Sequence, residues 1–300
     1  MKHIFIVDQS LSRMSKKAIE VKIASLCEKN DMDYSIYFTK IPGDGRHYAK
    51  TLENEDTAIV YAVGGDEILN EVLNGIAGSG HMLSIIPYGD GSDFYRTLKE
   101  YDKEYILADV GRINGQYFIN IACIGLDADI AKRASKIGKV PFFPPSIKYK
   151  ISMLPTLLTY KFKDLVITLG AHSVTGKYTA VSVCNGRFYG RGVKIATKAQ
   201  IDNGEFDIYI VEKLPKTSVW GMMLKLLKSQ HENDSRVVKY NDSTVEITGK
   251  KTLLCIVDGK MIYDNHFKIE LVRSAITVHY NKEFIEQLIG TKEKKKEDKK

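Results

Sequence analysis

The chain has 300 residues, a length that fits one large domain or two ordinary ones, and 44% of them are hydrophobic, which excludes a disordered chain. No apolar stretch approaches the length of a membrane span, and the first eight residues are too short an apolar run for a signal peptide, so we expect a cytoplasmic protein. The formal net charge is +7, and residues 291–300 supply +3 of it as a basic tail that we expect to be disordered.

Strand and helix patterns alternate along the first third of the chain. Residues 3–8 and 33–39 have the patterns of strands, and residues 58–65 form a near-continuous apolar run that ends in glycines. Such a run predicts a strand buried on both faces, as in a parallel sheet. Residues 69–76 then carry apolar side chains at helical spacing. A further buried strand at 82–88 completes a β-α-β-α-β order, which predicts a doubly wound α/β domain.

The pattern then changes to one dominated by strands. Residues 105–125 contain two strand-like runs on either side of Asn114 and Gly115, which is a strong hairpin signal. Many short strand-like runs follow residue 163, among them 244–248, 252–258, 267–272 and 275–280, and one helical stretch at 216–230 interrupts the series. This spacing predicts an antiparallel β-sandwich.

These patterns predict two domains. We expect an N-terminal α/β domain over 1–125, which the C-terminal segment 276–290 joins, and a C-terminal β-sandwich domain over 126–275. The boundary near residue 125 is the least certain part of this division, because the ends of elements are poorly defined by sequence patterns.

A basic stretch lies between the two parts of the pattern. Residues 132–163 contain eight Lys or Arg and no Asp or Glu, with apolar and aromatic side chains interleaved. An anionic membrane surface attracts this combination. A surface helix with lysine stems lying on apolar surface has the same composition, and on this segment alone we favour that simpler interpretation.

Glycine and acidic residues follow two neighbouring buried strands. Gly64, Gly65 and Asp66 close one strand, and residues 87–94 follow the next with two glycines and two aspartates. The carboxyl ends of parallel strands lie at one sheet edge, where glycines and a helix N-terminus can receive phosphate oxygens. A tight turn with Asp66 as helix N-cap explains the first loop equally well. Two such loops together favour a metal–nucleotide site.

Six segments stand in a fixed order between residues 64 and 260: 64–75, 87–96, 120–128, 185–192, 202–207 and 258–260. In that order they resemble GGDGTxxEVxNG, PxGTxNDFAR, NxxxxGxDA, NxxxYGGG, DDGxLD and DGE, the motifs of diacylglycerol kinase-like catalytic domains. That family includes bacterial lipid kinases and sphingosine kinases and is similar in fold to NAD kinases. The resemblance covers both expected domains.

The resemblance implies an ATP-binding N-terminal domain, a lipid-substrate C-terminal domain, and ATP and Mg²⁺ as cofactors. The ATP-binding residues that it implies are Thr39, Gly64, Gly65, Asp66, Glu67, Ile68, Asn70, Glu71, Gly89, Asp90 and Asp93. The catalytic positions that it implies are Asp258 and Lys260, with Asp258 as the base that takes the proton of a lipid hydroxyl. The Mg²⁺ site of bacterial members maps to Gln200, Asn203 and Glu205.

Departures from the motifs fall on functional positions. Glu67 replaces a glycine and Asp90 a threonine, which adds two negative charges where a polyanion is expected. Two like charges about 4 Å apart cost about 4 kcal/mol at an effective dielectric constant of about 20. Ile68 replaces a threonine hydroxyl, Asn203 replaces a metal-binding aspartate, and Lys260 replaces a glutamate with a protonated amine that cannot act as a base.

Three functional hypotheses follow. The first is an ATP-dependent lipid kinase that acts on a hydroxyl such as that of diacylglycerol and touches the membrane peripherally through 132–163. The second is a catalytically degenerate relative that binds a nucleotide or a lipid as a regulator, and the third is a kinase with a water-soluble acceptor. The sequence indicates no nucleic-acid partner and leaves a homodimer open.

Overall fold

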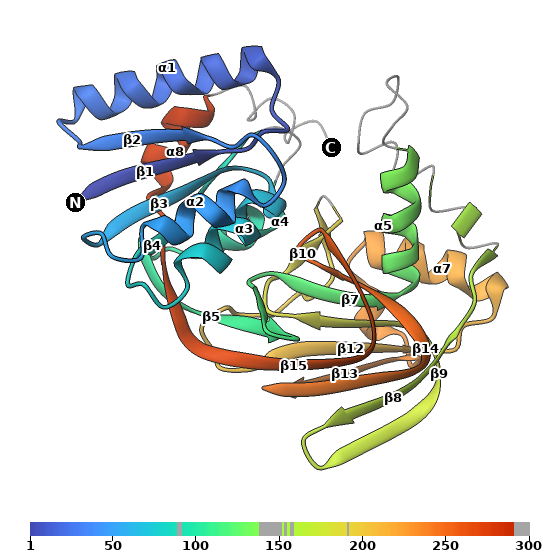
Figure 1. Ribbon diagram of the computed structural model, residues 1–300. Helices are drawn as coiled ribbons and strands as arrows, with labels where there is room; N and C mark the ends of the chain where they lie inside the picture. Colours follow the sequence, from blue (N-terminus) through green and yellow to red (C-terminus); the bar gives the residue numbers. More distant parts are fainter. Residues whose placement is uncertain (89–91, 138–151, 153–154, 157–158, 191, 291–300) are drawn as a thin grey trace. The chain divides into compact units, whose positions relative to one another are not determined.

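The computed structural model describes residues 1–88, 92–137, 152, 155–156, 159–190 and 192–290 (Figure 1). The chain divides into two compact units: the first is Met1–Ala108 with Ser274–Lys300, and the second is Asp109–Arg273. The sequence analysis placed this division near residue 125. Residues 121–125 pair with strands of the second unit, which is why the division falls earlier, at residue 109. The basic tail 291–300 and much of the 132–163 stretch lie outside the described residues.

A parallel sheet forms the centre of the first unit. Its strands are β1 (Lys2–Val7), β2 (Tyr34–Phe38), β3 (Ala58–Gly64) and β4 (Met82–Pro87), in the order β4-β3-β1-β2. β3 is buried along its whole length, which explains its near-continuous apolar sequence. The strand order reverses between β1 and β3, and ligands of open α/β sheets bind at such a switch point.

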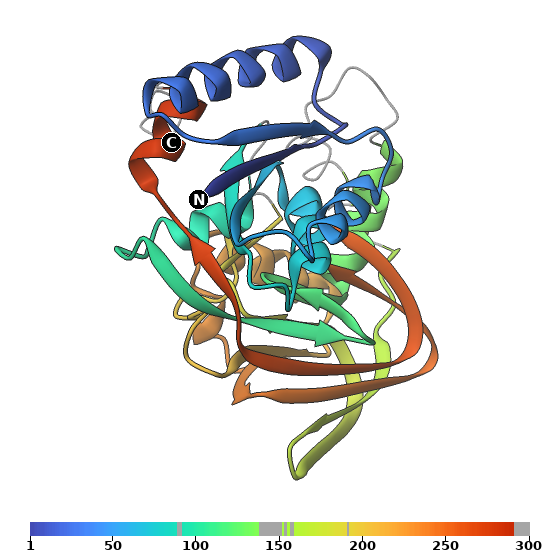
Figure 2. The same ribbon diagram turned by 60° about the vertical axis from the view of Figure 1, so that its left-hand side comes forward.

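Helices cover both faces of this sheet (Figure 2). They are α1 (Arg13–Lys29), α2 (Asp44–Thr51), α3 (Asp66–Ile76), α4 (Asp93–Leu98) and α8 (Lys282–Ile289). α1 and α8 share one face, where Ile19, Ile23 and Leu288 join an apolar cluster with strand residues. α2 and α3 pack together on the other face, and the expected apolar stripe of α3 is buried. The structure confirms the predicted α/β domain.

Antiparallel strands build most of the second unit. They are β6 (Gln116–Phe118), β7 (Ile121–Gly125), β8 (Lys163–Leu169), β9 (His172–Cys184), β12 (Phe206–Glu212), β13 (Val237–Asp242) and β14 (Thr244–Val257), with parts of β5 (Tyr105–Ile113) and β15 (Lys260–His279). A short ladder of β10 (Phe188–Tyr189) and β11 (Val193–Lys194) stands apart from them. Phe118, Phe206 and Phe267 are fully buried in the apolar core between these strands. This unit is the predicted sandwich-like domain.

Two long strands replace four predicted short ones. Residues 244–248 and 252–258 were expected to be separate, but both belong to β14, which continues through Gly249 with a shift of register against β15. Such a bulge absorbs extra residues without ending a strand. In the same way, β15 runs unbroken from Lys260 to His279 and reaches the first unit, where Val278 pairs with Leu83 of β4.

The second unit also contains the helices α5 (Leu126–Ile137) and α7 (Lys216–Leu227), with a short 3-10 turn, η1, at His231–Asn233. Leu126 and Ile130 of α5 and Val219, Met222 and Met223 of α7 belong to one apolar cluster. The two helices therefore lie next to each other, as Figure 1 shows.

Candidate active site

Gly64 ends β3 at the switch point of the first sheet. Its φ is 151°, and a Cβ at this position would lie 2.9 Å from Asp8 Cβ and 2.9 Å from Ile68 Cγ2. The backbone N–H of Asp8, just after β1, donates to Val63 O at 3.0 Å and ties the two strand ends together. Only glycine fits this position, and its backbone faces the edge where a phosphate-binding loop is expected.

Helix α3 begins directly after this loop. Gly65 is its N-cap residue, and no N-cap side chain accepts from the first-turn backbone N–H groups. These groups and the positive end of the helix dipole favour an anion. A glycine loop that leads into such a helix end is an arrangement suited to a phosphate group.

Asp66 joins the two predicted loops. Its carboxylate accepts hydrogen bonds from Ser92 Oγ at 2.6 Å, from Asp93 N at 2.8 Å and from Phe94 N at 3.1 Å. Asp66 therefore caps the start of the neighbouring helix α4 instead of its own helix. Burial and the nearby Asp93 carboxylate raise the pKa of Asp66 to about 7, despite the three donors.

The other loop residues differ in their surroundings. Asp93 is buried, and its carboxylate forms an ion pair of 3.0 Å with Arg96. Glu67 is exposed. Ile68 is buried, and its side chain lies next to Gly64. Two further predicted residues, Gly89 and Asp90, lie outside the described residues.

Glu71 holds the start of helix α2. Its two carboxylate oxygens accept the backbone N–H groups of Gly43 at 2.7 Å and Gly45 at 3.0 Å. Gly43 is the N-cap of α2 and has no side chain, so Glu71 supplies the missing acceptor. The neighbouring Asn70 is also buried, and its backbone oxygen accepts from Asn74 Nδ2 at 2.8 Å. The structure thus gives these two predicted ATP-binding residues partners inside the α2–α3 pair.

Thr39 shapes the loop after β1. Its hydroxyl donates to Val7 O at 3.1 Å and accepts the N–H of Gln9 at 2.7 Å. Thr39 is buried and follows β2, so it fixes the backbone on the β2 side of the switch point. Thr39, Gly64, Gly65, Asp66 and Asp93 all lie at the carboxyl edge of the first sheet, as predicted.

Asp258 occupies a tight turn in the second unit. Asp258 and Gly259 have φ values of 43° and 87°, as a two-residue hairpin turn between β14 and β15 requires. The Asp258 carboxylate is buried and accepts three backbone N–H groups at 2.9–3.1 Å, those of Ile119, Asn120 and Ile121. It therefore anchors the start of β7. Lys260 follows the turn as the partly buried first residue of β15.

A chain of buried polar side chains extends from this anchor. Asn120 Nδ2 donates to Phe188 O at 2.8 Å, and Asn185 Nδ2 donates to Asp109 O at 2.9 Å and to Ile119 O at 2.7 Å. Asn120 and Asn185 belong to two of the motif-like segments, and here they join those segments to the Asp258 turn. Asp109 was missed by the sequence analysis, although a single aspartate within an apolar run is a signal that could have found it.

The predicted metal-binding loop is exposed. Gln200, Asn203 and Glu205 are all on the surface, and Asn203 Oδ1 accepts the N–H of Glu205 at 3.2 Å in a local turn. The N–H of Gly204 donates to the buried Asp109 carboxylate at 2.7 Å. Among the described residues, no group of three His, Cys, Asp or Glu side chains is placed to hold a metal ion. One carboxylate and two amides on an exposed loop do not fit a Mg²⁺ site by themselves.

Comparisons with known families agree with this architecture. The diacylglycerol kinase catalytic domain matches residues 2–115, and the YegS C-terminal NAD kinase beta sandwich-like domain matches residues 120–280. The chain therefore belongs to the diacylglycerol kinase catalytic domain family, in the form that carries a YegS-like C-terminal domain. The family is one of lipid kinases that use ATP.

Individual relatives have moderate sequence identity to this chain. A diacylglycerol kinase of Bacillus subtilis (strain 168) is 26% identical over 252 residues, which cover 78% of this chain and 81% of the relative. A diacylglycerol kinase of Staphylococcus aureus (strain Newman) is 27% identical over 249 residues, covering 78% of each. The crystal structure of a diacylglycerol kinase from Bacillus anthracis str. Sterne matches with a TM-score of 0.63 at 20% identity. The crystal structure of a candidate diacylglycerol kinase from the same strain matches with a TM-score of 0.71 at 24% identity. Both matches cover 94% of this chain and 98% of the other, and they show the shared fold.

No helix in the part of the chain that the structure describes is both long and apolar enough to span a membrane.

Proposed function

We propose that this protein is an ATP-dependent lipid kinase that transfers the γ-phosphoryl group to a lipid hydroxyl such as that of diacylglycerol. The observation that carries the proposal is the glycine loop at the switch point, with Gly64 fixed by its surroundings and the N-terminus of α3 directly after it. Membership of the family and the activity named for the B. subtilis and S. aureus relatives support it.

The first unit supplies the groups for the nucleotide. Gly64 and Gly65 allow close approach of phosphate oxygens to the backbone, and the first-turn N–H groups of α3 can receive them. Asp66 keeps α4 and the second loop next to this position through Ser92 and the N–H of Asp93. Bound ATP supplies the transferable phosphoryl group. We expect Mg²⁺ to accompany ATP, because the acidic side chains of the two loops otherwise oppose a polyanion.

The second unit supplies Asp258 as the proposed base. Its carboxylate has about four acceptor positions, and three of them receive backbone N–H groups. The proposed proton acceptor is thus held rigidly by the segment 119–121. Lys260 lies two residues further on, at the start of β15, and we propose that its ammonium group steadies the transferring phosphoryl group.

A non-catalytic nucleotide or lipid regulator is the second candidate. The observation that favours it is the buried, apolar Ile68 next to Gly64, where the family motif has a hydroxyl. The exposed Asn203 and Glu205, which do not form a metal site by themselves, point in the same direction. This candidate binds ATP or lipid and transfers nothing.

Transfer of labelled phosphate from Mg-ATP to diacylglycerol in lipid vesicles tests the kinase. Gly64→Ala should abolish transfer, because its Cβ would clash with Asp8 and Ile68 at the proposed phosphate loop. Glu20→Ala on α1 is the control, since Glu20 is exposed and lies outside both the glycine loop and α7, and it should keep full activity. A glycerol-based water-soluble acceptor replaces diacylglycerol in a third arm and tests the hypothesis of a soluble acceptor.

The outcomes separate the candidates. Transfer to diacylglycerol that Gly64→Ala abolishes supports the proposal. A rise in melting temperature with Mg-ATP but no transfer to either acceptor supports the non-catalytic regulator. Equal transfer by Gly64→Ala and the wild-type protein shows that the loop does not hold the nucleotide.

A further inference from the structure

Helix α7 has apolar side chains on two of its faces. One face, with Val219, Met222 and Met223, is buried in the cluster that α7 shares with α5. The other carries Trp220, Leu224 and Leu227, which are 51%, 45% and 52% exposed. These three residues stand at i, i+4 and i+7, so they form one continuous stripe along the helix. A helix that needs only one apolar face for its own fold here exposes a second.

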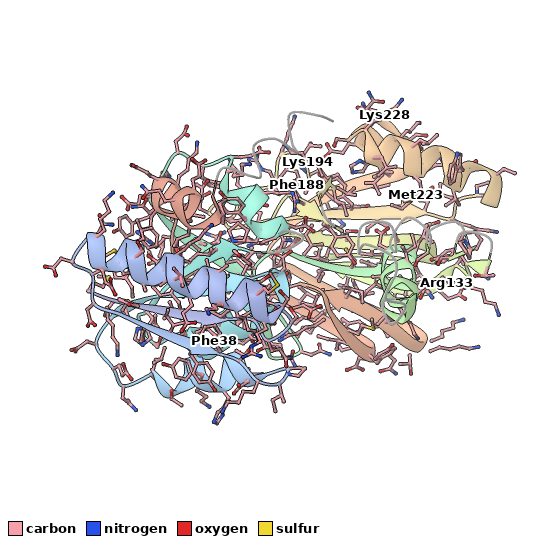
Figure 3. The ribbon with its side chains drawn as sticks, turned by 90° about the horizontal axis from the view of Figure 1, so that it is seen from above. Phe38, Arg133, Phe188, Lys194, Met223 and Lys228 are labelled. Carbon is pink, nitrogen blue, oxygen red and sulfur yellow. The ribbon has the colours of Figure 1, made fainter. Side chains whose placement is uncertain are left out.

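The charge around this stripe has a single sign. Residues 213–231 contain four lysines and no Asp or Glu. Lys225 and Lys228 lie on or directly after the helix and are exposed, and Lys228 points away from the ribbon at the helix end (Figure 3). The acidic groups that face α7 are already engaged: Asp234 is buried and pairs with Lys225 at 2.8 Å, and Glu232 accepts from Thr197 and Tyr209.

A basic pocket lies beside the neighbouring helix α5. The pocket beside α5, with a volume of about 440 Å³, is lined by Lys132, Arg133, Lys161 and Lys163, with Asp129 as its one acidic group. Asp129 is paired with Lys163 at 2.9 Å, so the pocket has a net positive charge. Because α5 and α7 share one apolar cluster, the exposed stripe and this basic pocket belong to neighbouring elements of the same unit.

A second copy of this chain is a poor occupant for the stripe. In a two-fold symmetric dimer the same patch meets itself, which would bring the lysines of one α7 against those of the other. Three exposed side chains also cover much less than the roughly 1,200 Å² that a stable interface buries. An anionic lipid surface matches both features, because it receives apolar side chains at the acyl boundary and attracts lysines at the phosphates.

We propose that α7 is the element that docks this protein on anionic bilayers. Trp220, Leu224 and Leu227 insert at the boundary between headgroups and acyl chains, while Lys228 contacts lipid phosphates. The expected membrane contact through 132–163 is thereby moved to α7, with the described pocket residues Lys132, Arg133, Lys161 and Lys163 on the neighbouring elements. This inference rests on the proposed lipid kinase function, but its test needs neither ATP nor catalysis.

The chain contains a single tryptophan, Trp220, which reports on α7 directly. The full chain is titrated with vesicles of phosphatidylglycerol and phosphatidylcholine, and with vesicles of phosphatidylcholine alone. The emission of Trp220 should shift to shorter wavelength on the anionic vesicles, and lipids brominated near the headgroup end of their acyl chains should quench it. Binding should weaken as salt is raised, because screening shortens the reach of the lysines.

Two variants and their controls test the contribution of the stripe and of the charge. Leu224→Ser with Leu227→Ser keeps Trp220 and should weaken vesicle binding by about tenfold or more, since two half-exposed leucines lose their apolar contact. Val21→Ser on α1 is the control, with an apolar side chain that is 60% exposed. Lys228→Glu should weaken binding to anionic vesicles, and the exposed Lys17→Glu on α1 should not.

Three results would overturn the docking proposal. One is co-sedimentation with vesicles while Trp220 stays unquenched, which would assign binding to another surface. Another is a concentration-dependent shift of Trp220 emission without lipid, together with a dimer that Leu224→Ser and Leu227→Ser abolish. The last is full vesicle binding by the Leu224→Ser, Leu227→Ser variant. Vesicle binding by a protein that transfers no phosphate would still support docking, so failure of the kinase proposal is recognised separately.

Discussion

The carboxylates of Asp66, Glu71 and Asp258 have the same structural role. Each accepts backbone N–H groups of another segment: the start of α4, the start of α2 and the start of β7, respectively. Their first contribution is therefore to backbone position, and any chemistry depends on it. Removing such an acceptor leaves buried donors unpaired, at a cost of about 1–3 kcal/mol for each. A loss of activity in these variants must be compared with their loss of stability.

Asp66 should make the stability of the protein depend on pH. Its pKa is raised to about 7 from an ordinary 3.8, so between about pH 4 and pH 7 the folded state binds a proton that the unfolded state has lost. The contribution of Asp66 to the free energy of unfolding is therefore full at low pH and is lost as pH rises through 7. The full shift corresponds to about 4 kcal/mol, and halving it for partial exposure leaves about 2 kcal/mol.

The measurement is the free energy of unfolding of wild type and Asp66→Asn between pH 5 and pH 8. The advantage of wild type over the variant should shrink as pH rises, because only wild type titrates at this site. The exposed Asp102→Asn, in the same unit, should follow wild type throughout. Parallel curves for wild type and Asp66→Asn would show that this carboxylate titrates alike in both states.

Asp258→Asn separates the structural contribution of this side chain from a role as base. An amide offers one acceptor oxygen and sets its NH₂ group against backbone donors, so the variant should lose about 3 kcal/mol of stability whatever its activity. If Asp258 is also the base, the residual activity should lose the acid limb of its pH–kcat/KM profile. Asp164→Asn breaks only an exposed ion pair of 3.8 Å and should change neither quantity. An unchanged acid limb would leave Asp258 as a positioning residue alone.

At the scale of elements, the sequence predicted those strands and helices whose apolar residues recur at a regular local spacing. The buried run 58–65 and the stripe of α3 became a central strand and a packed helix, because burial periodicity depends only on neighbouring residues. The junctions were not predictable in this way. Gly249 looked like the end of a strand, but the pairing of β14 with β15 continues past it. The partners of Asp66 and Glu71 lie 26 to 28 residues away, and no local pattern encodes such contacts.

α7 is a second case in which the local pattern was not sufficient. Its sequence is apolar around most of the helix, so periodicity identified a helix but could not tell which face the fold would bury. The structure buries Met222 and Met223 and leaves Trp220 exposed. A basic, apolar composition had drawn attention to 132–163 instead, where Tyr160 is in fact buried and donates to the backbone of Thr179.

Glu71→Ala tests whether this residue holds α2 or the nucleotide. Loss of its carboxylate leaves the N–H groups of Gly43 and Gly45 without their acceptor, so stability should fall by about 2–3 kcal/mol. Glu71→Gln keeps one oxygen and should lose about half as much. The melting temperature should still rise with Mg-ATP in both variants. Exposed Glu20→Ala on α1 is the control, and loss of the Mg-ATP effect in Glu71→Gln alone would place Glu71 in the nucleotide site.

At the scale of the whole molecule, the two units divide the proposed tasks. The first contains the glycine loop and the start of α3, and the second contains Asp258, Lys260 and the exposed stripe of α7. Family membership describes both units, but the departures at Ile68 and Lys260 fall one in each. In the proposed kinase, nucleotide binding and phosphoryl transfer can therefore be lost independently, and we expect binding to depend on the first unit.

Hydrogen exchange with and without Mg-ATP tests this division. A ligand present at 100 times its Kd stabilises the state that binds it by about 2.7 kcal/mol, which slows exchange of the amides whose opening releases the ligand by up to about a hundredfold. Protection should concentrate at residues 64–70 and 92–98, around the start of α3 and the Asp66-capped start of α4. Asp66→Ala should remove protection at 92–98 first, because it unties that helix from the loop, while Asp102→Ala should leave the pattern intact. Protection confined to residues 109–273 would place the nucleotide in the second unit and end the role proposed for the glycine loop.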